Sequence, residues 1–122
     1  MLGALMSLNV LIVDDNEAAA DLLQELLSLQ EHKAQCAYTG QQALDAAAGS
    51  RFDIALVDLT LPDIPGTAVA QRLRSDAVLA TPPLLVAVSG HAPSEETKAL
   101  FDHHLQKPID FEALDRILAL VA

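Results

Sequence analysis

Cationic side chains are scarce in this chain, which has 7 Lys and Arg residues against 17 Asp and Glu and a net charge of −10. Such an excess of negative charge argues against direct binding to nucleic acid or to an anionic membrane surface. Aromatic residues make up only 3% of the 122 residues, so Leu, Val, Ile and Ala must form most of the core. Hydrophobic residues reach 52%, which is typical of one globular domain of this length.

Cysteine is nearly absent, because Cys36 is the only one and cannot form an internal disulfide. A reducing compartment is therefore favoured, and we expect Cys36 to be a small core residue. Residues 1–7 are apolar, but they are too few to span a bilayer and lack the basic residues of a signal peptide. We expect a leader over 1–7 and a single domain over 8–122, with no membrane insertion by this chain.

Apolar segments of strand length alternate with helical patterns five times along the chain. We expect strands at 9–13, 33–38, 53–58, 84–89 and 103–106, and helices at 17–30, 40–48, 67–75, after Ser94 and after Asp110. This alternation predicts a parallel sheet with helices on both faces. The polar strand 103–106 is expected at an edge of the sheet.

The first and last helices each carry a stripe of apolar residues at three- and four-residue spacing. We expect these stripes to lie in the core: Leu22, Leu23, Leu26 and Leu27 in the first helix, and Phe111, Leu114, Ile117, Leu118 and Val121 in the last.

Charged and polar residues follow directly after the apolar strands. Asp14 and Asp15 end the first strand, Asp58 ends the third, Ser89 ends the fourth and Lys107 follows the fifth. The carboxyl ends of parallel strands share one edge of the sheet, so these groups are expected to converge there. Three adjacent carboxylates repel one another unless a cation lies between them, and an all-oxygen ligand set is what Mg²⁺ prefers.

Asp58 is the carboxylate that we expect to do chemistry, since it ends the central strand. An aspartate can act as a nucleophile and form an acyl phosphate. Lys107 would then neutralise the phosphoryl oxygens, while Ser89 would donate a hydrogen bond to one of them.

Four short motifs occur in order on this pattern: VLIVDDNE, DLTLPDIPG, VAVSG and QKP. Together they make the chain resemble the receiver domain of two-component response regulators along essentially its whole length, and most of all the receivers attached to hybrid sensor histidine kinases. The resemblance implies a doubly wound (βα)₅, flavodoxin-like three-layer sandwich with a parallel five-stranded sheet of order 2-1-3-4-5.

The resemblance also implies a role for each site residue. Asp15 and Asp58 would bind Mg²⁺ (or Mn²⁺) directly, together with the backbone carbonyl of Thr60, while Asp14 would act through water. The Lys107–Pro108 peptide would be cis, which X–Pro bonds tolerate.

By the same resemblance, Asp58 would be phosphorylated from the phosphohistidine of a histidine kinase or a histidine phosphotransfer domain. The domain would not be a classical enzyme, but would catalyse its own phosphorylation and dephosphorylation. It would be cytoplasmic, alone or tethered through a larger sensor kinase, with the first helix as the kinase-docking surface.

Two further expectations concern the output and the lifetime of the phosphate. Ser89 and His104 occupy the family's switch positions, with an imidazole where an aromatic ring is usual, and Thr60 and His91 flank the path of attacking water. Only 18 positions separate Ser89 from Lys107, about four fewer than is usual in the family and about one helical turn. We therefore expect a shortened fourth helix and a weak or altered homodimer.

Competing functions fit less well. An aspartate-based phosphatase would have a second acid two residues after the nucleophile, where this chain has Thr60, and no glycine-rich phosphate loop with a lysine is present. A receiver-like interaction module that is never phosphorylated remains the alternative. His103 and His104 are adjacent on a strand and point to opposite faces, so we do not expect them to chelate a metal together. His32 is expected to be a solvated loop residue.

Overall fold

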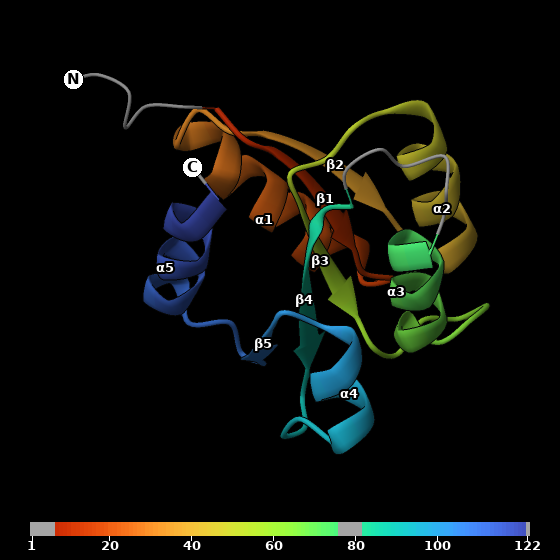
Figure 1. The fold of residues 1–122 in the computed structure, drawn as a ribbon. Coiled ribbons are helices and arrows are strands. Elements are labelled where there is room, and N and C mark those ends of the chain that lie inside the picture. Colours follow the sequence, from red (N-terminus) through yellow and green to blue (C-terminus); the bar gives the residue numbers. More distant parts are fainter. Residues whose placement is uncertain (1–6, 76–81, 122) are drawn as a thin grey trace.

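The computed structural model describes residues 7–75 and 82–121, which form a five-stranded parallel sheet with helices on both faces (Figure 1). The strand order is β2-β1-β3-β4-β5. The strands are β1 (Asn9–Val13), β2 (Lys33–Ala37), β3 (Ile54–Asp58), β4 (Leu84–Ser89) and β5 (His103–Gln106). The helices are α1 (Glu17–Leu29), α2 (Gly40–Gly49), α3 (Gly66–Ser75), α4 (Glu95–Leu100) and α5 (Phe111–Val121).

The predicted architecture is confirmed, including the sheet order, the edge position of β5 and the short α4. With 6 residues α4 is the shortest helix of the described part, against 10 to 13 in the others. The expected domain boundary near Leu8 stays a prediction, because residues 1–6 of the expected leader lie outside the described residues. None of the helices in the described ranges combines the length and the apolar character needed to cross a bilayer.

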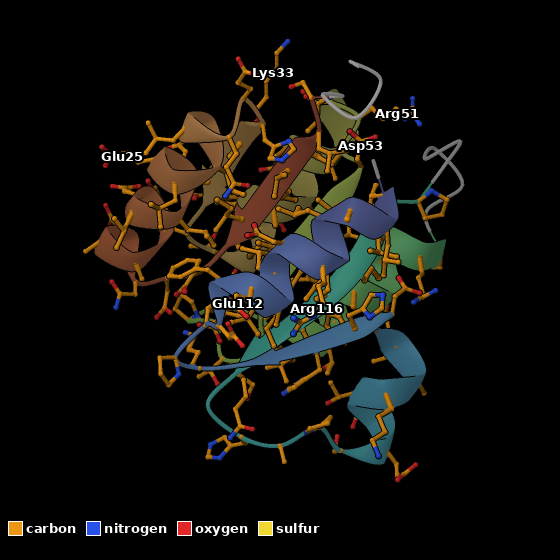
Figure 2. All side chains as sticks on the ribbon, turned by 90° about the vertical axis from the view of Figure 1, so that its left-hand side faces the viewer. Glu25, Lys33, Arg51, Asp53, Glu112 and Arg116 are labelled. Carbon is orange, nitrogen blue, oxygen red and sulfur yellow. The ribbon has the colours of Figure 1, made fainter. Side chains whose placement is uncertain are left out.

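The sheet separates two apolar cores. On one face α1 and α5 pack against β-strand residues such as Ile12 and Leu56, and on the other α2 and α3 pack against Leu11 and Val57 (Figure 1). β3 is buried along its whole length because it is central and covered on both faces. Figure 2 views the first face, with Glu112 and Arg116 on the outer side of α5. The polar groups of the sheet can then collect only at the strand ends.

A side-chain oxygen caps the amino-terminal end of three helices. Asn16 accepts a hydrogen bond from the backbone N–H of Ala19 at the start of α1. Thr39 does the same for α2 and Ser94 for α4, each accepting from the residue three positions on. These caps satisfy amide groups that have no partner inside the helix. They explain why each helix begins directly after a strand-end loop that carries polar residues.

Two aspartates tie neighbouring strands together at the amino-terminal edge of the sheet. Asp53 Oδ2 accepts a hydrogen bond from the N–H of Asn9 at 2.8 Å, and Asp102 Oδ2 accepts one from Leu85 at 2.8 Å. Asp102 also pairs with Arg74 of α3 at 3.1 Å. Figure 2 shows Asp53 at this edge, near Lys33 and Arg51. Both carboxylates fix strand register at the end of the sheet opposite the converging strand ends.

The expectation that all four leucines of α1 lie in the core is wrong for Leu22, which is 56% exposed. The buried stripe is Ala20, Leu23 and Leu27, at the spacing of one helix face. Leu22 is one position away from Leu23, which turns it by about 100° out of the contact with the sheet. Leu26 is only half-buried for the same reason.

In α5 the inward stripe is confirmed at Leu114, Ile117 and Leu118, but not at Phe111, which is 49% exposed. Phe111 lies in the first turn, at the carboxyl edge where the sheet ends, so little of the core reaches it. Val121 is half-buried.

Two isolated residues also differ from their expectations. Cys36 is half-buried rather than fully in the core, and its thiol donates a hydrogen bond to Ala20 O at 3.4 Å. Burial raises the pKa of this thiol, and the neighbouring Asp21 raises it further. His32 is not simply solvated, because its Nδ1 accepts a hydrogen bond from the N–H of Leu8 at 3.1 Å.

Candidate functional site

Three carboxylates meet at the carboxyl edge of the sheet. Oxygens of Asp14, Asp15 and Asp58 all lie within 4.8 Å of one another. Asp14 and Asp15 follow β1 and Asp58 ends β3, which is paired to β1 in parallel register. The sequence prediction that these acids converge is confirmed.

Asp58 is the most enclosed acid of the three, with 6% of its surface exposed. Its Oδ1 accepts a hydrogen bond from the N–H of Thr60 at 2.9 Å, while its Oδ2 lies 2.9 Å from Lys107 Nζ. Gly66 crosses directly over its backbone, since a Cβ at Gly66 would come within 2.3 Å of Asp58 O. Contacts on each carboxylate oxygen hold the side chain in one orientation.

Asp14 supports the same cluster from β1. Its Oδ1 accepts a hydrogen bond from the N–H of Asn16 at 2.9 Å, and its Oδ2 lies 3.4 Å from Lys107 Nζ. Burial raises the pKa of Asp14, and the charge of Asp58 raises it further, while the Asn16 amide and the Lys107 charge act in the opposite direction. Asp14 in its ionised form is therefore held against an unfavourable environment.

Lys107 brings the cationic charge to this cluster. Burial acts to lower the pKa of Lys107, but the hydrogen bond and charge of Asp58, helped by Asp14, outweigh it and leave the pKa raised. The ammonium group is therefore charged at neutral pH. The peptide to Pro108 is cis, as the resemblance implied.

Ser89 and Lys107 are joined through the backbone, because the N–H of Lys107 donates to Ser89 O at 2.7 Å. Ser89 is buried, with 7% of its surface exposed. Its hydroxyl oxygen accepts a hydrogen bond from the N–H of His91 at 3.1 Å. Since the oxygen is the acceptor in that contact, the hydroxyl hydrogen can donate to another group.

Of the remaining predicted residues, Thr60 contacts Asp58 through its backbone N–H, while His91 and His104 lie beside Ser89. Thr60 and His91 are exposed and lie two residues beyond the last residues of β3 and β4. His104 is half-buried, and its Nε2 lies 3.1 Å from His91 O. Its Nδ1 is buried and has no hydrogen-bond partner among the described residues. His104 therefore contacts the loop after Ser89 rather than the carboxylates.

Sequence reasoning missed two residues that hold the site in shape. Asn16 both caps α1 and fixes Asp14, and its position directly before a helical pattern is a recognisable cap signal. The carboxylate of Asp63 accepts hydrogen bonds from the first two amides of α2. No local sequence pattern predicts a contact between elements so far apart in the chain.

The donor set suits a hard divalent cation, since all three candidate ligands offer carboxylate oxygens and no nitrogen or sulfur. Mg²⁺ takes one or two carboxylates and fills its remaining positions with water, carbonyl oxygens or phosphate. Within the described ranges, no second group of three potential ligands of this kind occurs. Such a centre, beside a buried aspartate and an ammonium group, can stabilise a phosphoryl group that is being transferred.

Comparison with known proteins agrees with this chemistry. The family model described as the response regulator receiver domain matches residues 10–119. The chain is 34% identical over 116 residues to the sensor histidine kinase AtsR of Burkholderia thailandensis, covering 92% of this chain and 19% of that protein. It is 32% identical over 112 residues to the response regulator MprA of Mycobacterium tuberculosis, covering 89% of this chain and 48% of MprA. The chain thus spans about a fifth of one relative and about half of the other.

Solved structures give the same picture. A response regulator receiver domain of Methylobacillus flagellatus, described as CheY-like, superposes with a TM-score of 0.90 at 35% identity, covering 96% of this chain and all of that one. The chemotaxis protein CheY4 of Vibrio cholerae gives 0.85 at 25% identity, with the same coverage.

Proposed function

We propose that this chain, which belongs to the response regulator receiver domain family, accepts a phosphoryl group on Asp58 in a two-component phosphorelay. The observation that carries the assignment is the setting of Asp58. It is a buried carboxylate with an ammonium group 2.9 Å from one oxygen and two further carboxylates within 4.8 Å.

The reaction is a transfer of phosphorus from nitrogen to oxygen. A carboxylate oxygen of Asp58 attacks the phosphorus of a phosphohistidine, the P–N bond breaks, and the imidazole nitrogen keeps the electron pair. The Lys107 ammonium group neutralises charge on the phosphoryl oxygens, and the free hydroxyl hydrogen of Ser89 donates to one of them. In the separate dephosphorylation step, water attacks the phosphorus of the acyl phosphate, the P–O bond to Asp58 breaks, Asp58 keeps its carboxylate oxygen and inorganic phosphate leaves. The domain so catalyses its own phosphorylation and dephosphorylation.

The metal of this site is Mg²⁺, with Mn²⁺ as a substitute of similar ligand preference. We assign Asp15, Asp58 and the backbone carbonyl of Thr60 as direct ligands and Asp14 as a ligand through water. The exposure of Asp15 supports its assignment as a direct ligand. The cation supplies positive charge that offsets the charge gathered on the carboxylates and the phosphoryl group.

The partner that donates the phosphoryl group is a histidine kinase or a histidine phosphotransfer domain. We assign α1 as its docking surface, and the apolar side chain of Leu22 on the outer face of this helix, 56% exposed, supports that assignment. The net charge of −10 makes direct nucleic-acid contact unfavourable. A cytoplasmic setting accords with the family and with the scarcity of cysteine, of which Cys36 is the single instance.

The decisive experiment is phosphorylation of the purified chain by acetyl phosphate with and without Mg²⁺, followed by mapping of the modified residue. We expect Mg²⁺-dependent labelling on Asp58 that is lost in Asp58→Asn and in Asp15→Ala. Asp45→Asn, which removes one exposed acid from α2, is the matched control and should label normally. Equal labelling of Asp58→Asn would show the assignment to be wrong. No labelling of the wild type by acetyl phosphate or by a cognate kinase would favour an interaction module that is never phosphorylated.

The lifetime of the phosphate depends on the two residues that flank it, Thr60 and His91. The backbone N–H of His91 donates to Ser89 Oγ and its carbonyl oxygen lies 3.1 Å from His104 Nε2, so the backbone that carries this side chain is held beside Ser89. Replacing the imidazole in His91→Ala opens the approach of water and should shorten the half-life of the acyl phosphate without altering Mg²⁺ affinity. An unchanged half-life would refute this role.

Output is proposed to run through Ser89 and His104 to the surface formed by α4, β5 and α5. One of its elements, α4, has only 6 residues here, so we propose weak or altered dimerisation through this surface. Light scattering with and without beryllofluoride and Mg²⁺ tests this. A strong activation-dependent dimer, broken by substitutions on α4 or α5, would contradict it.

A further inference from the structure

Asp63 stands at the tip of the loop that joins β3 to α3, and it is bound to a different part of the chain. Its Oδ1 accepts a hydrogen bond from the N–H of Gly40 at 2.8 Å, and its Oδ2 accepts one from Gln41 at 2.9 Å. Both amides belong to the first turn of α2, where no partner exists inside the helix. The amides of Gln41 and Gly40 lower the pKa of Asp63, so the carboxylate is ionised at neutral pH.

The contact with α2 continues through the next residue of the loop. A Cβ added at Gly40 would come within 2.3 Å of Ile64 Cγ1, so the loop packs directly on the backbone of α2 at this point. The absence of a side chain at Gly40 is what permits so close an approach. Asp63 and Ile64 together fasten the loop tip to the start of α2.

The fastened loop is the one that carries Thr60. Its base is closed by a hydrogen bond from the N–H of Gly66 to Leu59 O at 3.1 Å, and one limb is tied to Asp58 through the N–H of Thr60. These bonds hold the two ends of the loop but not its tip. The tip is held against α2 by Asp63, three positions after Thr60.

The start of α2 is in turn fixed relative to the acids of β1. The strand that leads into α2 ends at Ala37, whose carbonyl oxygen accepts a hydrogen bond from the N–H of Asp14 at 3.0 Å. A chain of backbone contacts therefore runs from Asp14 through the end of β2 and the start of α2 to Asp63. Asp63 closes this chain by joining it to the loop of Thr60.

We infer that Asp63 is a positioning residue of the metal site, which sets the Thr60 carbonyl relative to Asp14 and Asp15 by clamping the loop to α2. The inference rests on the proposed function, because it takes Thr60 as a ligand of Mg²⁺. Asp63 is not itself assigned as a ligand, because it lies outside the cluster of Asp14, Asp15 and Asp58 and its oxygens accept from α2.

The test measures Mg²⁺ dissociation constants by calorimetry or NMR for the wild type, Asp63→Ala, Asp63→Asn and Thr39→Ala. Thr39→Ala is the matched control, because Thr39 Oγ1 caps the same end of α2 by accepting from Gln42 N–H at 3.0 Å, and among the described residues its side chain makes no hydrogen bond to the loop. Outer supporting contacts of a metal site change its affinity by about tenfold or more, and this more distant clamp should give about fivefold weaker binding in Asp63→Ala and little change in Thr39→Ala.

Asp63→Asn separates geometry from charge. It removes the same negative charge as Asp63→Ala but keeps one oxygen to accept an amide, so it should bind Mg²⁺ more tightly than Asp63→Ala does. This difference in Mg²⁺ affinity between Asp63→Asn and Asp63→Ala should persist in 0.5 M salt, where the electrostatic screening length falls to about 4 Å. The amide resonances of Gly40 and Gln41 should also shift when Mg²⁺ is added to the wild type.

Equal Mg²⁺ affinity in the wild type and Asp63→Ala would overturn the inference while leaving the proposed function intact. Equal weakening in Thr39→Ala and Asp63→Ala would overturn it too, because a loosened α2 would then be a sufficient cause. If Asp63→Ala does not fold, the comparison of Asp63→Asn with Thr39→Ala decides the question by the same criterion. Failure of the wild type to bind Mg²⁺ would instead remove the proposed metal site itself.

Discussion

Replacing Asp14 by asparagine should stabilise the metal-free domain, because the carboxylate cluster is unfavourable for folding. At the limiting separation of 4.8 Å, each of its two carboxylate neighbours repels Asp14 by about 3.5 kcal/mol with an effective dielectric constant of about 20. Lys107 Nζ, at 3.4 Å, returns about 5 kcal/mol on the same basis. The net cost of the Asp14 charge is thus about 2 kcal/mol, and less where water screens the pairs.

Asn at this position keeps an oxygen that can accept the hydrogen bond from Asn16. The gain in the free energy of unfolding should therefore be about 0.5–2 kcal/mol, or about 4 °C in the melting temperature for each kcal/mol in a domain of this size. Urea and thermal unfolding in EDTA measure it. Asp45→Asn again serves as the control for charge alone and should change the stability much less.

The pH dependence of the stability difference between Asp14→Asn and the wild type provides a second check on the sign of that difference. The pKa of Asp14 in the folded state is raised above its ordinary value of 3.8. The free energy of unfolding therefore falls as the pH rises from 3.8 through the folded-state pKa, because the group ionises less readily in the folded domain. The difference between variant and wild type should therefore vanish at pH values below 3.8 and be complete at neutral pH. Mg²⁺ should narrow the difference, since it stabilises the wild type by mass action. An Asp14→Asn variant that is no more stable than wild type in EDTA would refute the reasoning.

Two further predictions concern residues outside the site. Tyr38 OH donates to Asp21 Oδ1 at 2.6 Å, and this hydrogen bond, with burial and the Asp21 charge, raises the pKa of Tyr38 to about 12. Tyr38 is the only tyrosine and there is no tryptophan, so the ultraviolet absorbance of tyrosinate reports it alone. The transition should move toward 10 in Asp21→Ala, and an identical transition would contradict the contact. Asp102→Ala should cost about 2 kcal/mol of stability, because it leaves the buried amide of Leu85 without its acceptor and Arg74 without its ion pair. Asp102→Asn should recover part of that loss in urea unfolding, and equal losses would argue against the hydrogen bond as the cause.

The sequence predicted the fold and the centre of the site for the same physical reason. Continuous apolar strands require a sheet covered on both faces, and polar residues can follow such strands only at their ends. The sequence alone therefore predicted that Asp58 and Lys107 lie close together, although 49 positions separate them. The contacts of the cluster are confirmed, while the metal ligation and phosphorylation assigned to it stay predictions.

What the sequence did not reveal depends on tertiary position. Leu22 and Leu23 are equally apolar, and only the orientation of α1 on the sheet decides that Leu22 is exposed. Phe111 shares the spacing of the buried stripe, but it falls where the sheet ends. In the sequence, Asp63 and Asp102 cannot be told from ordinary loop acids. The amides that they bind lie 17 to 23 positions away in other elements, where no local pattern connects them. Periodicity describes one element at a time and carries no information about such pairs.

Lys107 follows the last strand of the sheet, so it is the last charged group of the site to be synthesised. A ribosome delivers Asp14, Asp15 and Asp58 before the ammonium group that compensates them. The first four strands can pair in the nascent chain, since β1 joins β2 and β3, and β3 joins β4, without β5. Until β5 adds to β4 and Lys107 bonds to Ser89, the three carboxylates face one another with no lysine between them. Mg²⁺, the metal that we propose for this site, would then be the cation that offsets the carboxylates of the growing domain.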